Sequence, residues 1–199
     1  MGKNLLLLFT ILGFTFGSMT KAQDTAGSVE TANPLEQLDM GESADAPRIG
    51  QRYIKEKFGA WDLVCVETDA EKDPCSITQV LTDQNANPVA EFSMFRLSGG
   101  DEAVAAANVV VPLETLLTAQ LLISVDGAIG RRYNYSFCHQ QGCVAQVGFN
   151  KDDIASLKNG LTASIELVPA AAPNRVITLN LSLSGFIPAY EAVDIVAAN

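Results

Sequence analysis

Four cysteines are the residues of this chain with the most definite chemistry. They are Cys65, Cys75, Cys138 and Cys143, an even set that predicts two disulfides if the chain is exported. We expect Cys65 to pair with Cys75 and Cys138 with Cys143, because each pair spans a predicted strand, turn and strand. Each bond would stabilise the fold by about 2–3 kcal/mol. Spacing alone leaves the crossed pairings open.

Zinc binding is the alternative use of these thiols. The spacing within each cysteine pair differs from the close pairs typical of zinc sites, and His139 is the single histidine. The chain also contains no C-x-x-C motif, so a thioredoxin-like redox role lacks its signature. We therefore expect no metal and no cofactor.

The sequence contains no complete set of catalytic residues. Neither Ser98 nor Ser136 lies in a G-x-S-x-G context, and His139 falls in a predicted exposed loop with no orienting carboxylate indicated by the sequence. Asp152 and Asp153 are explained by a helix N-terminus, where negative charge is favourable. We predict that the protein is not an enzyme.

Two groups of charged residues remain. Four acids between Glu67 and Asp73 lie on one predicted turn and could bind calcium, but they lack EF-hand spacing and include Lys72, which favours a solvated loop. Arg131 and Arg132 form a basic doublet. It could bind an acidic partner, whereas protection of an edge strand is the more usual role of such charges.

The segments that must position these residues are mostly short strands. Apolar and polar residues alternate around Trp61, which we place in the core, and Asp126-Gly127 is a strong hairpin signal. Asn150 and Gly160 bracket one short helix. The pattern predicts an all-β fold, an antiparallel β-sandwich that could be a jelly roll, with one short helix and two disulfides. The strands are expected at 60–68, 75–82, 89–97, 103–111, 121–125, 132–137, 144–149, 161–168 and 176–184.

The N-terminal residues predict export. Lys3 precedes an apolar run of about a dozen residues, and Thr20-Lys21-Ala22 offers a cleavage site before Gln23. We therefore divide the chain into a cleaved signal (1–22), an acidic disordered spacer (23–50), a β-sandwich domain (51–190) and a C-terminal tail (191–199). The mature chain is expected to have no membrane span and to reside in the periplasm or outside the cell.

The overall charge excludes some classes of partner. The formal net charge is −10, which argues against nucleic-acid binding and against docking on an anionic membrane surface. A protein or a surface polymer is the expected kind of partner, of unknown identity.

Several motifs resemble the invasion-associated locus B family. They are Gly59-Ala-Trp-Asp-Leu-Val-Cys65, the later Cys75, Val110-Val-Pro-Leu-Glu-Thr-Leu116, Ser124-Val-Asp-Gly127, Phe137-Cys-x4-Cys143-x-Ala145 and Leu181-Ser-Leu-Ser-Gly-Phe186. The match in order and spacing covers about residues 51–190. The resemblance implies an exported all-β protein of alphaproteobacteria, named for a role in host-cell invasion, with no established catalytic residues. It therefore favours an interaction protein of the bacterial envelope over an envelope enzyme or a strand-adding chaperone or inhibitor.

Overall fold

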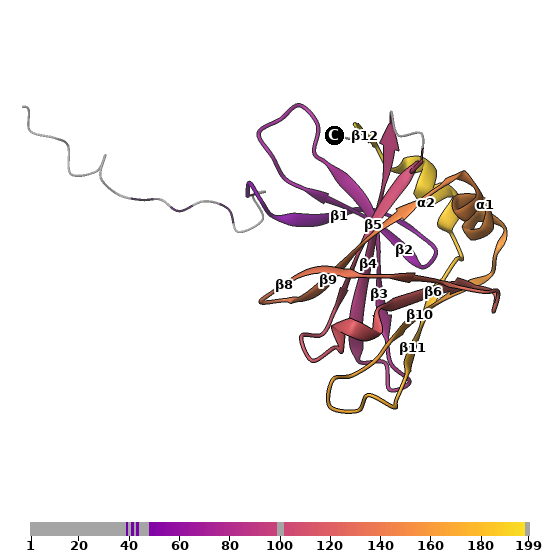
Figure 1. Cartoon of the computed structure of the whole chain (residues 1–199). Coiled ribbons are helices and arrows are strands. Elements are labelled where there is room, and N and C mark those ends of the chain that lie inside the picture. The colour runs from indigo at the N-terminus through magenta and orange to yellow at the C-terminus, as the bar shows by residue number, and fades with distance from the viewer. Residues whose placement is uncertain (1–38, 40, 42, 44–47, 99–101, 198–199) are drawn as a thin grey trace, which may run out of the picture. The chain divides into compact units, whose positions relative to one another are not determined.

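Two β-sheets build the part of the chain that carries the cysteines (Figure 1). The computed structural model describes residues 39, 41, 43, 48–98 and 102–197, so the expected signal and most of the expected spacer lie outside the described residues. Apart from one short parallel pairing, the strands are antiparallel. The predicted all-β fold stapled by two disulfides is confirmed.

The large sheet has the strand order β1-β2-β3-β4-β5-β9-β8, with β12 paired to β4. Its strands are β1 (Arg52–Phe58), β2 (Trp61–Val66), β3 (Cys75–Thr82), β4 (Pro88–Ser98), β5 (Ala105–Val111), β8 (Tyr135–His139), β9 (Gly142–Phe149) and β12 (Ile195–Ala197). The small sheet has the order β11-β10-β6-β7. Its strands are β6 (Leu121–Val125), β7 (Arg131–Tyr133), β10 (Thr162–Leu167) and β11 (Ile177–Ser182).

The core lies between one face of the large sheet and the small sheet. The alternation along β2 buries Trp61, which is fully inaccessible to solvent, as predicted. Its indole ring packs edge-on to Phe92 of β4 at 5.8 Å between centroids, and against Phe186 at 5.4 Å. From the small sheet, Ile165 and Leu179 are buried completely as well. Such aromatic packing adds to the stabilisation that apolar burial supplies.

A hydrogen-bonded contact joins the two sheets at β11. The buried Gln79 side chain of β3 donates to the Ser182 carbonyl at 3.0 Å and accepts from the Ser182 N–H at 2.8 Å. The Trp61 indole N–H donates to the same carbonyl at 3.0 Å. The buried Gln79 amide and the Trp61 indole N–H therefore both have partners, as burial requires.

Two helices occur where the sequence predicted one. The predicted helix is α1 (Lys151–Asn159), which begins with a capping box between Asn150 and Asp153. The second helix, α2 (Phe186–Ala192), buries Phe186, Ala189 and Tyr190. One 3-10 turn, η2, spans Leu117–Ala119.

The C-terminal residues differ from the expected tail at 191–199. Helix α2 continues to Ala192, Val193 is buried, and β12 pairs in parallel with β4. The pattern in the sequence missed this segment because β12 has only 3 residues, all exposed, and so lacks apolar alternation.

One strand changes sheets at Asn134. The segment predicted as a single strand at 132–137 is β7 of the small sheet followed by β8 of the large sheet. The Asn134 side chain lies between them and accepts from the Gln120 side-chain amide at 2.9 Å. Strands that switch sheets in this way form the corners of β-sandwiches.

The hydroxyl of Tyr135 is buried without a hydrogen-bond partner among the described residues. Burial raises the pKa of Tyr135 to about 12, whereas an unfolded chain has a tyrosine pKa near 10. Between these values the unfolded chain loses the proton and the folded chain keeps it. The contribution of Tyr135 to stability is therefore fully present below about pH 10 and decreases as the pH rises toward 12.

We predict that Tyr135→Phe raises the free energy of unfolding at neutral pH by about 1 kcal/mol, because it removes an unpaired buried hydroxyl. It should also reduce the fall in stability above about pH 10. Urea unfolding at several pH values measures both effects. The matched control is Tyr53→Phe, which removes a hydroxyl that donates to Asp73 and should destabilise. A loss of stability in Tyr135→Phe would show instead that the Tyr135 hydroxyl is hydrogen-bonded in the folded protein.

Gly59 in the β1–β2 turn lies against Gly185, which precedes α2. Gly185 has φ +84°, and a Cβ added there would lie 2.0 Å from the Phe58 carbonyl oxygen. We predict that Gly185→Ala lowers the free energy of unfolding by more than about 1 kcal/mol. Gly148→Ala is the control, because its Cβ would meet only Ala103, at 3.6 Å. Equal urea midpoints for the two variants would refute the steric constraint.

Candidate functional site: a groove on the large sheet

Both disulfides link residues that face each other on neighbouring strands. Cys65 of β2 is bonded to Cys75 of β3, and Cys138 of β8 to Cys143 of β9. This is the local pairing preferred from the sequence. No cysteine is left free among the described residues, and the bonds indicate an oxidising, extracytoplasmic environment.

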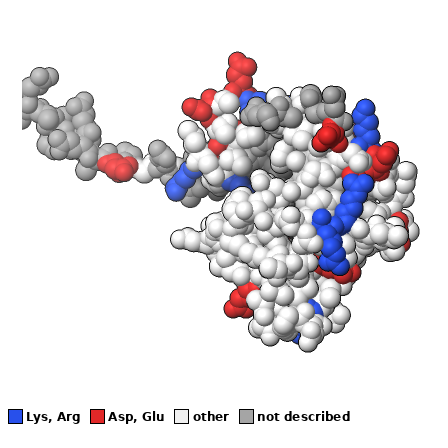
Figure 2. All heavy atoms as spheres, in the orientation of Figure 1, with Lys and Arg blue, Asp and Glu red and all other residues white. Residues whose placement is uncertain are grey.

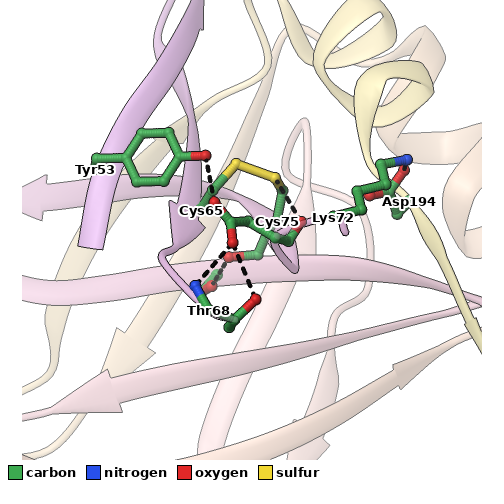
Figure 3. Close-up of a disulfide and its surroundings, with 9 residues drawn as sticks. Tyr53, Cys65, Thr68, Lys72, Cys75 and Asp194 are labelled. Carbon is green, nitrogen blue, oxygen red and sulfur yellow. Dashed lines mark hydrogen bonds and ion pairs between the residues drawn. A yellow bond between two sulfur atoms is a disulfide. The ribbon is translucent and has the colours of Figure 1, made fainter. Parts of the chain in front are cut away.

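The first disulfide anchors the acidic loop that the sequence offered as a calcium site (Figure 3). Asp73 accepts from the Tyr53 hydroxyl at 2.9 Å and from the Thr68 N–H at 2.8 Å, and Lys72 pairs with Asp194. The hydrogen bond from Tyr53, followed by that from the Thr68 N–H, lowers the pKa of the Asp73 carboxyl. In the described part of the chain, no group of three or more His, Cys, Asp or Glu residues could hold a metal ion. The contacts of Asp73 and Lys72 tie this loop to β1 and to Asp194, which precedes β12.

A groove of about 790 Å³ lies on the side of the large sheet away from the small sheet. Strands β3, β4 and β5 supply its floor, including Val80 and Val110, and the start of β1 supplies Arg52. The tip of the β8–β9 hairpin borders it with His139 and Gln141. Figure 1 shows this hairpin projecting from the sheet.

The register explains how residues far apart in the sequence line up beside the groove. Val80 lies opposite Glu91, Glu91 opposite Val110, Val110 opposite Val144, and Val144 opposite Phe137. Directly opposite residues of antiparallel strands share a face. We call these five residues the groove row. Its end members are exposed, Val80 by 55% and Phe137 by 51%.

A second row of the same face is polar. It consists of Asp62, Thr78, Ser93, Asn108 and Gln146, each opposite the next. The Thr78 hydroxyl donates to Ser93 at 3.4 Å, and the Ser93 hydroxyl donates to Ser76 at 3.0 Å. The outer face of the large sheet thus sets a mainly apolar row beside a row of carboxylate, hydroxyl and amide groups.

One ion pair lies within the groove. The Arg52 guanidinium donates to both carboxylate oxygens of Glu91, at 2.9 and 3.4 Å. Both side chains are partly exposed, so the pair contributes little to stability. Its consequence is local neutrality, since the charge of Glu91 is matched by that of Arg52.

His139 is exposed at the end of β8, as expected of a loop histidine. Its Nδ1 accepts from the Gln141 N–H at 3.2 Å, and its ring lies 5.9 Å from that of Phe137. The carboxylate that shares the groove with it, Glu91, is bound by Arg52. A general base needs an orienting partner and a nucleophile; the Gln141 side-chain amide contacts the His139 ring, and Glu91 is paired with Arg52.

The other residues singled out in the sequence do not gather at the groove. Arg131 and Arg132 lie on β7, an edge strand of the small sheet, where Arg131 pairs with Asp153 at 3.0 Å. Ser98 ends β4, and Ser136 lies exposed on β8. The groove row could not be predicted from the sequence, because the strand register that aligns its residues leaves no local signal.

Comparisons with known proteins give a consistent result. The family model "Invasion associated locus B (IalB) protein" matches residues 61–194.

Within the described residues, no helix is long and apolar enough to cross a membrane.

Two named relatives cover most of the chain. An invasion protein B homolog of Brucella abortus (strain 2308) is 23% identical over 145 residues, which is 72% of this chain and 81% of that protein. Invasion protein B of Bartonella bacilliformis is 24% identical over 186 residues, covering 92% and 93%.

A solved structure shares the fold. The crystal structure of invasion associated protein B from Bartonella henselae matches with a TM-score of 0.58 and 24% identity, over 68% of this chain and 91% of that one. With the family model spanning both disulfides and strands β3, β4 and β5 of the groove floor, the chain belongs to the invasion-associated locus B family.

Proposed function

We propose that the protein is an exported, non-catalytic binding protein of the bacterial envelope, and that its partner binds at the groove. The observation that carries the proposal is the groove row, which presents apolar side chains beside a self-compensated ion pair. Ligand sites combine mainly apolar walls with a few polar groups in this way. Neither hydrolysis nor transfer chemistry is needed to explain such a surface.

Export is part of the proposal. The predicted signal at 1–22 and the two disulfides support a mature protein in the periplasm or outside the cell. The expected partner is a protein or a surface polymer. The names of the relatives, invasion protein B, support a contribution to attachment to or entry into host cells.

The test is crosslinking in intact cells, followed by non-reducing capture of the tagged chain and mass spectrometry. We predict that Val80→Lys lowers recovery of the partner by at least about tenfold, because it places a long charged side chain over the apolar floor. The new lysine lies opposite Glu91, a pairing that sheets tolerate, so the fold should be retained.

The control is Asn180→Lys, which adds the same charge at an exposed position of the small sheet. It should leave recovery unchanged. An equal loss of partner recovery in both variants would show that the partner does not bind at the groove. Absence of any partner, together with turnover of an envelope substrate by the purified protein, would overturn the binding function itself.

A further inference from the structure

We propose that β8 takes up an extended, uncharged polypeptide segment as an additional strand of the large sheet. The inference rests on the proposed binding function and specifies how the partner is held. The segment would supply backbone hydrogen bonds to β8 and apolar side chains in continuation of the groove row. Its recognition is thus of the strand-addition type.

The open edge of β8 is the first observation. Strand β8 ends the order of the large sheet, and β9 is its one strand neighbour among the described residues. In an antiparallel sheet, alternate residues of an edge strand turn both their N–H and their C=O groups outward. Such groups are a ready template for another chain.

Among the described edge strands, charged residues guard β1 and β7 but not β8, β11 or β12, and β12 has only 3 residues and pairs in parallel with β4. Strand β1 carries Arg52, Lys55, Glu56 and Lys57, and β7 carries the arginine doublet. Charges of this kind prevent unwanted strand pairing. Strand β11 has no charged residue, but both backbone groups of its Ser182 are already bonded to Gln79.

The sequence of β8 is Tyr-Ser-Phe-Cys-His, without Lys, Arg, Asp or Glu. In Figure 2 the projection that corresponds to the β8–β9 hairpin is white throughout, so charged side chains are absent from it in this view. This surface favours an uncharged occupant.

The edge is also held in a fixed conformation. The Cys138–Cys143 bond joins β8 to β9 within the hairpin, and Cys143 is buried. A template that is ordered before binding loses less conformational entropy when the partner arrives. The described hairpin therefore has the rigidity that strand addition requires.

The chemistry of the occupant follows from its neighbours. Phe137 is half exposed and stands opposite Val144 in the groove row, so an apolar side chain beside it would extend the row. The one charged member of the row, Glu91, is already compensated by Arg52. A second copy of this chain is a poorer occupant, because both copies carry a formal net charge of −10.

The experiment uses the unaltered protein and a blocked peptide of alternating threonine and valine. We expect the peptide to slow amide exchange within Tyr135–His139, and its fully N-methylated counterpart, which keeps the side chains but lacks N–H donors, to have no effect. Phe137→Asp should weaken binding by at least about tenfold. Asn180→Asp, an exposed residue of β11, should leave binding unchanged.

The contrary outcomes are distinct. Equal binding of both peptides would overturn strand addition while leaving the groove as a binding site. Concentration-dependent dimerisation that protects the same amides, without peptide binding, would make a second copy the occupant. If Phe137→Asp captures the cellular partner as well as the unaltered protein does, strand addition is refuted. If the proposed binding function itself is wrong, no partner is captured by either protein. If Phe137→Asp does not fold, strand addition is still tested by comparing how the two peptides affect amide exchange in the unaltered protein.

Discussion

The contact of Gln79 and Trp61 with the Ser182 backbone is the interaction on which the arrangement of the two sheets depends. Three hydrogen bonds, each between 2.8 and 3.0 Å, tie β3 and β2 to the end of β11. They lie beside the aromatic cluster around Trp61, so hydrogen bonding and apolar burial favour the same geometry. Because buried polar groups must be paired, loss of this contact would cost more than three ordinary surface hydrogen bonds.

This coupling decides which face of the large sheet is free. Residues such as Phe92 and Met94 are turned toward the small sheet and are buried, while Glu91 and Ser93 between them face outward. Part of the outer face is open to solvent, at Val80 and Phe137, and these side chains are accessible to a ligand. The groove row and the polar row are the result.

The features with local signals were the predictable ones. The alternation around Trp61, the Asp126-Gly127 turn and the Asn150 cap are each encoded within a few residues, and the structure contains all three. The switch of sheets at Asn134 was not predicted, because the chain stays extended across it. Helix α2 was missed since it has only 7 residues and contains Pro188. Long-range register is likewise invisible in one sequence, which is why the groove row emerged only from the strand pairings.

Membership of the invasion-associated locus B family defines the fold and the class of relatives, while the groove offers a physical basis for binding. The most direct test of that claim is hydrogen–deuterium exchange of the protein with and without its captured partner. If the partner binds at the groove, exchange slows in β8 and in the parts of β3, β4 and β5 that line the groove, with α1 and α2 unchanged. Protection confined to the helices or to the small sheet would contradict binding at the groove.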